Sequence, residues 1–99
     1  MDWLFTWGGR CFGYREGDAL WTYNGRHVGN FINENIFSSN GRYLGELTSE
    51  GRLIANKSKH NLQGTCFAPY VNRVGYVKCV DYVGYVMLSG FEDFPKLEK

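Results

Sequence analysis

Residues 24–29 read Asn-Gly-Arg-His-Val-Gly, and this stretch decides the fold because it recurs at a fixed interval along the chain. Its core is the pentapeptide Gly-Arg-x-φ-Gly, where φ is an apolar residue. Three copies are present, at Gly9–Gly13, Gly25–Gly29 and Gly41–Gly45, and the interval is 16 residues in both cases (25 − 9 and 41 − 25). Three copies in register within 99 residues indicate a fold built by repeating one small unit.

Each copy begins with a dipeptide that is typical of a tight turn. The three dipeptides are Gly8-Gly9, Asn24-Gly25 and Asn40-Gly41. Such pairs accept positive φ at both central positions, as the type I′ turn of a two-residue β-hairpin requires. Aromatic and β-branched residues precede each turn and favour strands. We therefore expect each unit to be strand, tight turn, strand.

A two-residue turn would also fix the pairing of side chains across each hairpin. One predicted layer sets a large aliphatic residue against glycine: Leu4 with Gly13, Leu20 with Gly29, and Ile36 with Gly45. A second predicted layer sets apolar against apolar: Phe5 with Phe12, Trp21 with Val28, and Phe37 with Leu44. Because glycine weakens a strand, its recurrence suggests tight curvature or a gap that the aliphatic residue fills.

The second half of the chain repeats less regularly. After units at 3–18, 19–34 and 35–50, we expect residues 51–67 to form a degenerate fourth unit. Val74-Gly-Tyr-Val77 recurs nine residues later as Val83-Gly-Tyr-Val86, which predicts a final strand pair within residues 70–89. Residues 91–99 are expected to be a C-terminal tail, so that residues 1–90 make one repeat-built domain.

Composition limits the classes of function. A net charge of +1 and a pI of about 7.7 disfavour binding to nucleic acid or to an anionic membrane. The three cysteines, at 11, 66 and 79, are odd in number and lack the spacing of metal ligands. This favours a reducing cytoplasm without disulfides. The sequence shows neither a signal peptide nor a membrane-spanning run.

The tandem string φ-x-x-Asn-Gly-Arg-x-φ-Gly, carried on aromatic strands over Trp3–Leu47, resembles the four-fold β-flower proteins. The resemblance implies an all-β, pseudo-symmetric array of about four β-hairpins that radiate around a shallow barrel. It implies no particular activity. Gly8 replaces the motif's asparagine in the first unit, and the weak fourth unit leaves open whether the barrel closes.

The arginine of the repeat is the residue that folding alone does not explain. If the hairpins radiate from one centre, the three arginines form a rim of guanidinium groups, which bind phosphate and carboxylate with two parallel hydrogen bonds. The predicted ligand-binding set is Arg10, Arg26 and Arg42 with their flanking aromatics Trp7 and Tyr23. The alternative is that each arginine keeps its turn soluble and stacks on the aromatic across the hairpin.

These observations favour a non-catalytic binding module over an enzyme. We expect capture of an anionic small molecule or a phosphate-bearing headgroup, with no cofactor and no metal. A second hypothesis is a small protein-binding antagonist or immunity factor of phage or mobile-element origin, whose partner is a host protein. An enzyme would need Cys11 and His27, which occupy equivalent positions in neighbouring units, to meet. Either binding hypothesis is compatible with a homo-oligomer, because both faces of the hairpins carry apolar residues that need cover.

Overall fold

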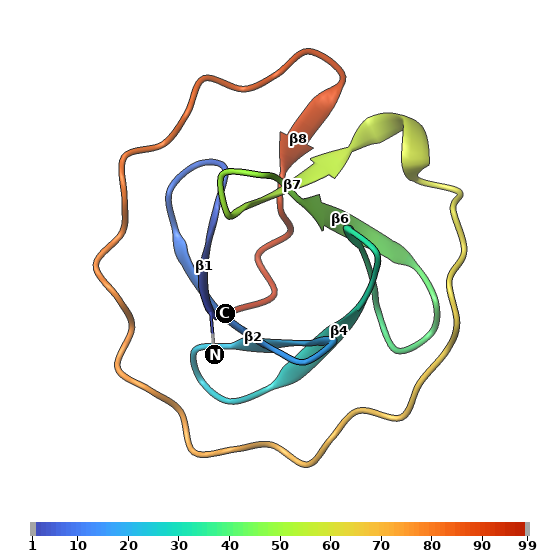
Figure 1. Cartoon of the computed structure of the whole chain (residues 1–99), viewed down its shortest axis with the longest axis vertical. Coiled ribbons are helices and arrows are strands. Elements are labelled where there is room, and N and C mark those ends of the chain that lie inside the picture. The colour runs from blue at the N-terminus through green and yellow to red at the C-terminus, as the bar shows by residue number, and fades with distance from the viewer. Residues whose placement is uncertain (1, 99) are drawn as a thin grey trace.

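The computed structural model describes residues 2–98, and these residues form an all-β fold without an α-helix. The strands are β1 (Asp2–Thr6), β2 (Cys11–Glu16), β3 (Ala19–Thr22), β4 (His27–Ile32), β5 (Asn35–Phe37), β6 (Tyr43–Leu47), β7 (Arg52–Asn56) and β8 (Phe91–Asp93). One 3₁₀ turn, η1 (Lys57–Lys59), follows β7. Figure 1 shows the hairpins arranged around a common centre, which confirms the predicted fold class.

The barrel closes through β7. Consecutive strands pair antiparallel, and β1 returns to pair in parallel with the start of β7, where Phe5 lies opposite Arg52 and Thr6 opposite Leu53. The rest of β7, from Ile54 onward, pairs with β8 instead. Strands β1 and β8 therefore share one edge of β7, and β1 to β7 form a closed seven-stranded barrel.

The repeated turn differs from the type I′ turn that we predicted. Gly25 has a φ of +91°, but Asn24 is not among the residues of positive φ. The Gly25 amide donates to the Thr22 carbonyl at 3.0 Å, and the Thr22 amide donates to the Arg26 carbonyl at 2.9 Å. This is a three-residue loop, in which a type I turn is followed by a left-handed glycine and a bulge.

The bulge shifts the register of each hairpin next to its turn. The predicted layer of aliphatic residues against glycine is confirmed in all three hairpins: Leu4 with Gly13, Leu20 with Gly29, and Ile36 with Gly45. The predicted apolar layer is wrong by one residue: Phe5 lies opposite Cys11, Trp21 opposite His27, and Phe37 opposite Tyr43. The extra residue in each loop is the cause.

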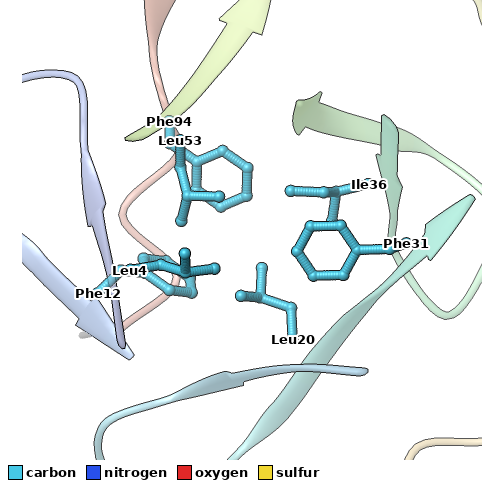
Figure 2. Close-up of a cluster of buried hydrophobic side chains, with 7 residues drawn as sticks. All are labelled: Leu4, Phe12, Leu20, Phe31, Ile36, Leu53 and Phe94. Atoms are coloured by element: carbon cyan, nitrogen blue, oxygen red, sulfur yellow. The ribbon is translucent and has the colours of Figure 1, made fainter. Parts of the chain in front are cut away.

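The aliphatic partners of these glycines fill the centre of the barrel (Figure 2). Phe94, which follows β8, packs among them, and its ring meets that of Phe12 edge to face at 5.1 Å. The buried cluster comprises Leu4, Phe12, Leu20, Phe31, Ile36, Leu53 and Phe94. One core thus draws on every hairpin and on the segment after β8, so the barrel and the end of the described chain fold together.

Residues 64–88 form no strand, and the strand pair expected within residues 70–89 is absent. We call this segment the belt, because it passes around the outside of the hairpins as one continuous loop (Figure 1). At the second hairpin the Arg73 amide donates to the Gly25 carbonyl at 2.7 Å, and the Tyr76 amide donates to the Tyr23 carbonyl at 2.7 Å. The belt is thus bound to the backbone of the turn.

The same pair of hydrogen bonds between the belt and the turn recurs at the other two hairpins of the repeat. The equivalent bonds run from Tyr82 to Gly9 (2.8 Å) and Tyr85 to Trp7 (3.0 Å) at the first hairpin, and from Gly64 to Gly41 (2.8 Å) and Phe67 to Ser39 (2.9 Å) at the third. Nine residues of belt therefore span the same arc as sixteen residues of barrel. The nine-residue repeat seen in the sequence is therefore the belt's own repeat, and one belt repeat pairs with one 16-residue repeat of the barrel.

The belt's own side chains explain why it is not a strand. Valine occupies every third position from Val71 to Val86, and each of these valines is 85–93% exposed. A strand presents alternate residues on one face, whereas a period of three is that of an extended, polyproline-like chain. The local alternation around the two Val-Gly-Tyr-Val copies concealed this longer period.

The fourth hairpin consists of β7 and β8, rather than the expected unit at 51–67. Residues Lys57 to Gly90, which include η1 and the belt, separate its two strands. The fourth hairpin therefore has the whole belt in place of a short turn, which is why its sequence does not show the repeat.

Candidate functional site

The motif arginines are held at equivalent places by a hydroxyl that the sequence analysis did not single out. The backbone amide of Arg10 donates to Thr6 Oγ1 at 3.2 Å, and the amide of Arg26 donates to Thr22 Oγ1 at 3.1 Å. In the third hairpin the donor is Arg42 and the acceptor is Ser38 Oγ, at 3.3 Å. The unit is thus Thr/Ser-x-x-Gly-Arg, and the interval of 16 between these hydroxyl residues was a signal for it.

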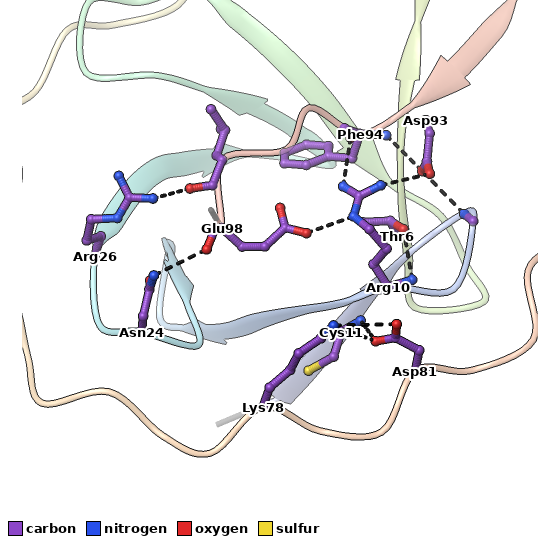
Figure 3. Close-up of polar contacts among 12 residues, drawn as sticks. Thr6, Arg10, Cys11, Asn24, Arg26, Lys78, Asp81, Asp93, Phe94 and Glu98 are labelled. Atoms are coloured by element: carbon purple, nitrogen blue, oxygen red, sulfur yellow. Dashed lines mark hydrogen bonds and ion pairs between the residues drawn. The ribbon is translucent and has the colours of Figure 1, made fainter.

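Arg10 faces the segment that follows β8 (Figure 3). Its Nε donates to Glu98 Oε2 at 2.7 Å and its Nη1 to Asp93 Oδ2 at 3.1 Å. Its Nη2 donates to the Phe94 carbonyl at 3.1 Å. The whole guanidinium fork is therefore engaged within the chain.

Arg26 faces the same segment from the second hairpin (Figure 3). Its Nη2 donates to the Leu97 carbonyl, and the neighbouring Asn24 Nδ2 donates to the Glu98 carbonyl at 3.2 Å. Two of the three rim arginines thus bind the polypeptide that the sequence analysis expected to be a simple tail. Protein atoms of this segment therefore fill the place between Arg10 and Arg26 where a ligand was expected.

Arg42 has a different environment. It is exposed, and its guanidinium has no ion pair or hydrogen bond to any of residues 2–98. It lines an open cavity of about 480 Å³ between the third hairpin and the β7–β8 hairpin. The lining residues are Ser38, Ser39, Asn40, Arg42, Tyr43, Leu44, Ala55, His60, Glu92 and Pro95.

The polar groups of this cavity include some that sequence reasoning missed. His60 Nε2 lies 3.6 Å from Glu92 Oε1, and Ser38 Oγ donates to Asn40 Oδ1. His60 follows η1, and Glu92 lies on β8, in the segment that the sequence analysis expected to be a C-terminal tail. No local pattern joins these residues to Arg42, because β7 and η1 lie between Arg42 and His60, and the belt lies between His60 and Glu92.

The two aromatic residues of the predicted set lie under the belt, not in an open site. Trp7 is buried, its Nε1 donates to the Val86 carbonyl at 2.9 Å, and its ring lies 4.9 Å from that of Tyr85. Tyr23 is half-buried and accepts the Tyr76 amide through its carbonyl. Both hold the belt.

A second cavity, of about 540 Å³, includes Glu16, Trp21 and Arg73 in its lining. Here the cation is already paired: Arg73 Nη2 lies 2.8 Å from Glu16 Oε1, and its guanidinium stacks 3.8 Å above the Trp21 ring. The pair lowers the pKa of Glu16 and raises that of Arg73. Because Glu16 balances the charge of Arg73, this cavity attracts an anion less strongly than the cavity at Arg42.

The structure does not bring Cys11 and His27 together as an enzyme would need. His27 Nε2 contacts two acceptors, the Gly29 carbonyl at 3.0 Å and Asn30 Oδ1 at 2.7 Å, while its Nδ1 accepts the Tyr70 amide at 3.1 Å. These contacts describe a neutral ring with a proton on Nε2 and both nitrogens occupied. Burial beside the Cys79 thiol raises the pKa of Cys11 to about 11. Neither a free base nor a reactive thiolate results.

Within residues 2–98, no group of three or more His, Cys, Asp or Glu side chains is arranged to hold a metal ion. The same part of the chain contains no helix that is long and apolar enough to cross a bilayer.

Comparison with known proteins agrees with this architecture. A family model described as 4-fold beta flower protein matches residues 1–72, which cover the first three hairpins, β7 and the start of the belt. The chain therefore belongs to this family. No curated protein sequence and no solved structure gave a significant match.

Proposed function

We propose that this member of the 4-fold beta flower family is a non-catalytic binding module that captures an anionic small molecule beside Arg42. The observation that carries the proposal is the contrast among the three rim arginines. Arg10 and Arg26 bind backbone and carboxylate groups of the chain itself, whereas Arg42 presents its guanidinium to an open cavity.

The size and lining of the cavity favour a phosphate-bearing ligand. Its volume of about 480 Å³ lies within the usual range for small-molecule sites. Arg42 supplies a fork of N–H donors, which matches phosphate oxygens, and Ser39 and Asn40 supply further polar groups on the same turn. His60 adds a second donor on the opposite wall. Inositol phosphates and nucleotides carry the charge and the size that such a lining fits.

Titration calorimetry with inositol hexakisphosphate and with ATP tests the proposal. We expect one site per chain, and Arg42→Ala should weaken binding about 10-fold or more, since charge-assisted hydrogen bonds to phosphate are lost. Arg73→Ala is the matched control, because Arg73 is also exposed but is paired with Glu16. Equal loss in both variants would indicate diffuse attraction to positive charge, and no heat with any ligand would overturn the proposal.

A second function, binding of another protein, is favoured by one specific feature. The belt carries a row of almost fully exposed valines: Val71, Val74, Val77, Val80, Val83 and Val86. Continuous apolar rows of this kind on a surface mark interaction sites. The belt forms the convex outer edge of the molecule (Figure 1). A second copy, equally convex, would therefore cover only part of its exposed valines. The partner proposed is a different protein with a concave apolar groove.

Size measurement and charge substitution test this second function. On this hypothesis the chain does not form the homo-oligomer considered from the sequence, so light scattering should give a monomeric mass. A dimeric mass would instead make a second copy the occupant of the valine row. A host protein captured by the wild type should be lost with the double variant Val77→Asp and Val80→Asp. It should be retained by Arg42→Ala, because no belt residue lines the Arg42 cavity. Retention by the aspartate variant would exclude the valine row as the interface.

We also propose that the protein works in a reducing compartment such as the cytoplasm. The support is that Cys11, Cys66 and Cys79 are all free thiols. Mass spectrometry of protein alkylated under denaturing conditions directly after isolation should find three alkylated cysteines, since Cys11 is buried in the folded chain.

A further inference from the structure

The segment after β8 crosses the centre of the molecule and ends between the first two hairpins (Figure 1, Figure 3). We call residues 94–98 the strap. Beyond Phe94 it forms no strand, and side chains of the barrel hold it: Arg10 at the Glu98 carboxylate, Arg26 at the Leu97 carbonyl and Asn24 at the Glu98 carbonyl. The contacts resemble those between a receptor and a short peptide.

The barrel residues that hold the strap belong to the 16-residue repeat, whereas the strap itself does not. Arg10 and Arg26 are the same residue of two successive units, sixteen positions apart, and each is fixed by its own Thr hydroxyl. The strap lies outside the repeats and contributes mainly groups that any peptide possesses. Its specific side chains are Leu97, which packs against the buried core cluster, and Glu98.

Glu98 is unusual because a carboxylate rarely lies so deep in a small barrel. It is only 3% exposed. One oxygen, Oε2, accepts from Arg10 Nε at 2.7 Å, while the buried Oε1 has no hydrogen-bond partner within residues 2–98. Burial of a charge with one oxygen unsatisfied is unfavourable. The strap is therefore a ligand that the barrel holds with an incomplete set of hydrogen bonds.

We propose that the barrel mouth between Arg10 and Arg26 is a binding site for acidic peptides, and that the strap is its intramolecular occupant. The site takes an apolar residue followed by a carboxylate, as in Leu97-Glu98. It adjoins the cavity at Arg42, which Pro95 of the strap also lines, but its polar contacts come from Arg10, Asn24 and Arg26, none of which lines that cavity. Its ligand is a peptide rather than a small phosphate compound. A peptide of another protein with this pattern would bind when the strap leaves.

The strap can leave without opening the sheet. Phe94 is fixed in the core, and Pro95 and Lys96 follow without pairing to any strand. Release from Pro95 onward would break the polar contacts of Leu97 and Glu98 and uncover one leucine. A tethered ligand has an effective concentration on the order of millimolar, so a free peptide competes poorly with the intact strap. The apparent affinity for a free peptide is the intrinsic affinity multiplied by the fraction of molecules whose strap is undocked.

A fluorescent peptide with the sequence of residues 91–99 tests the inference in the full-length protein. Its anisotropy should reveal weak binding to the wild type and binding at least about tenfold tighter to Glu98→Gln, whose strap has lost its charged contact. Glu50→Gln is the matched control, because Glu50 is an exposed carboxylate in the turn before β7 and has no hydrogen bond to Arg10, Asn24 or Arg26 within residues 2–98. It should leave the affinity for the peptide unchanged.

Two further measurements separate peptide binding from a general loosening of the fold. A peptide with glutamine at the position of Glu98 should bind the Glu98→Gln protein no better than the original peptide binds the wild type. Arg10→Ala should bind neither peptide, while the thermal unfolding of each variant reports whether the barrel is intact. If Glu98→Gln is unfolded, Leu97→Ser serves as the release variant, because it weakens the strap without touching the carboxylate. A folded release variant with wild-type affinity for the peptide would overturn the proposal.

Discussion

The amide of Tyr76 donates a hydrogen bond of 2.7 Å to the carbonyl of Tyr23, and this bond locks two different repeats into one register. The equivalent bond from Tyr85 to Trp7 lies nine residues later in the belt and sixteen residues earlier in the barrel. Because both segments advance by one unit together, the belt cannot slide relative to the hairpins without breaking every such bond. The belt is therefore part of the architecture rather than a loose loop.

The first prediction concerns the glycine on which the belt rests. A Cβ at position 25 would lie 2.0 Å from the Arg73 carbonyl oxygen, and Gly25 also has a positive φ. Gly51 has a φ of +78° in the same type of turn, but a Cβ there would meet nothing within 4 Å. Gly51→Ala should cost about 1 kcal/mol of unfolding free energy from backbone strain alone. Gly25→Ala should cost about 2–3 kcal/mol more, because the belt must shift as well.

Urea unfolding measures the two free energies, and brief proteolysis measures release of the belt. We expect faster cleavage between Arg73 and Tyr76 in Gly25→Ala but not in Gly51→Ala. Equal costs and equal cleavage rates would mean that the belt is not seated on the turn in solution.

The sequence predicted the part of the fold that local chemistry controls. The pairing of Leu20 with Gly29 followed from the repeat alone, because both residues lie beyond the bulge, where the register recovers. The pairing of Trp21 failed because Asn24-Gly25 allows two turn types, and the choice between them depends on the hydroxyl of Thr22 and on the belt. A dipeptide rule cannot include either contact.

The candidate site was less predictable than the fold. The interval of 16 placed Arg10, Arg26 and Arg42 at equivalent positions, and the structure bears out that equivalence. What distinguishes them is the strap, which binds Arg10 through Glu98, at the other end of the described chain. No local pattern in the sequence indicates where an unpaired segment will dock.

The second prediction concerns Arg52, a buried cation that binds both β1, the strand that closes the barrel, and the belt. Its Nη1 donates to the Thr6 carbonyl at 3.3 Å and its Nη2 to the Val83 carbonyl at 3.0 Å, while the guanidinium lies 4.2 Å above the Tyr85 ring. Lysine cannot reach both carbonyls at once. Arg52→Lys should therefore lower the unfolding free energy by about 2–3 kcal/mol. Arg15→Lys, at a more exposed arginine of β2, is the control, and an equal loss there would contradict the role of the fork.

The third prediction is a loss of stability at alkaline pH. Burial, together with the adjacent Cys79 thiol, raises the pKa of Cys11 from 9.0 to about 11 in the folded protein. The unfolded chain ionises first, so the stabilisation is complete below pH 9 and disappears as the pH rises through 11. Near pH 10 the loss should be on the order of 1 kcal/mol. Burial also raises the pKa of Tyr43, which acts in the same direction.

Urea unfolding across this pH range, under reducing conditions, measures the effect. Cys11→Ala should flatten the decline, while Cys66→Ala, which removes an exposed thiol, should keep the wild-type slope. An unchanged slope in Cys11→Ala would show that other groups control the alkaline transition.

The fourth prediction uses the one carboxylate on the wall of the Arg42 cavity. Glu92 lies near His60 and is on the same cavity lining as Arg42, so it repels any anion that enters. Glu92→Gln removes the charge and keeps the shape, and it should raise the affinity for inositol hexakisphosphate about threefold at low ionic strength. Added salt should reduce the gain, because the interaction is partly exposed to solvent. Glu50→Gln, an exposed carboxylate in the turn before β7, should have no effect on calorimetric affinity. A weaker affinity in Glu92→Gln would instead mean that Glu92 positions His60 for the ligand, and the electrostatic account of the cavity would have to be reversed.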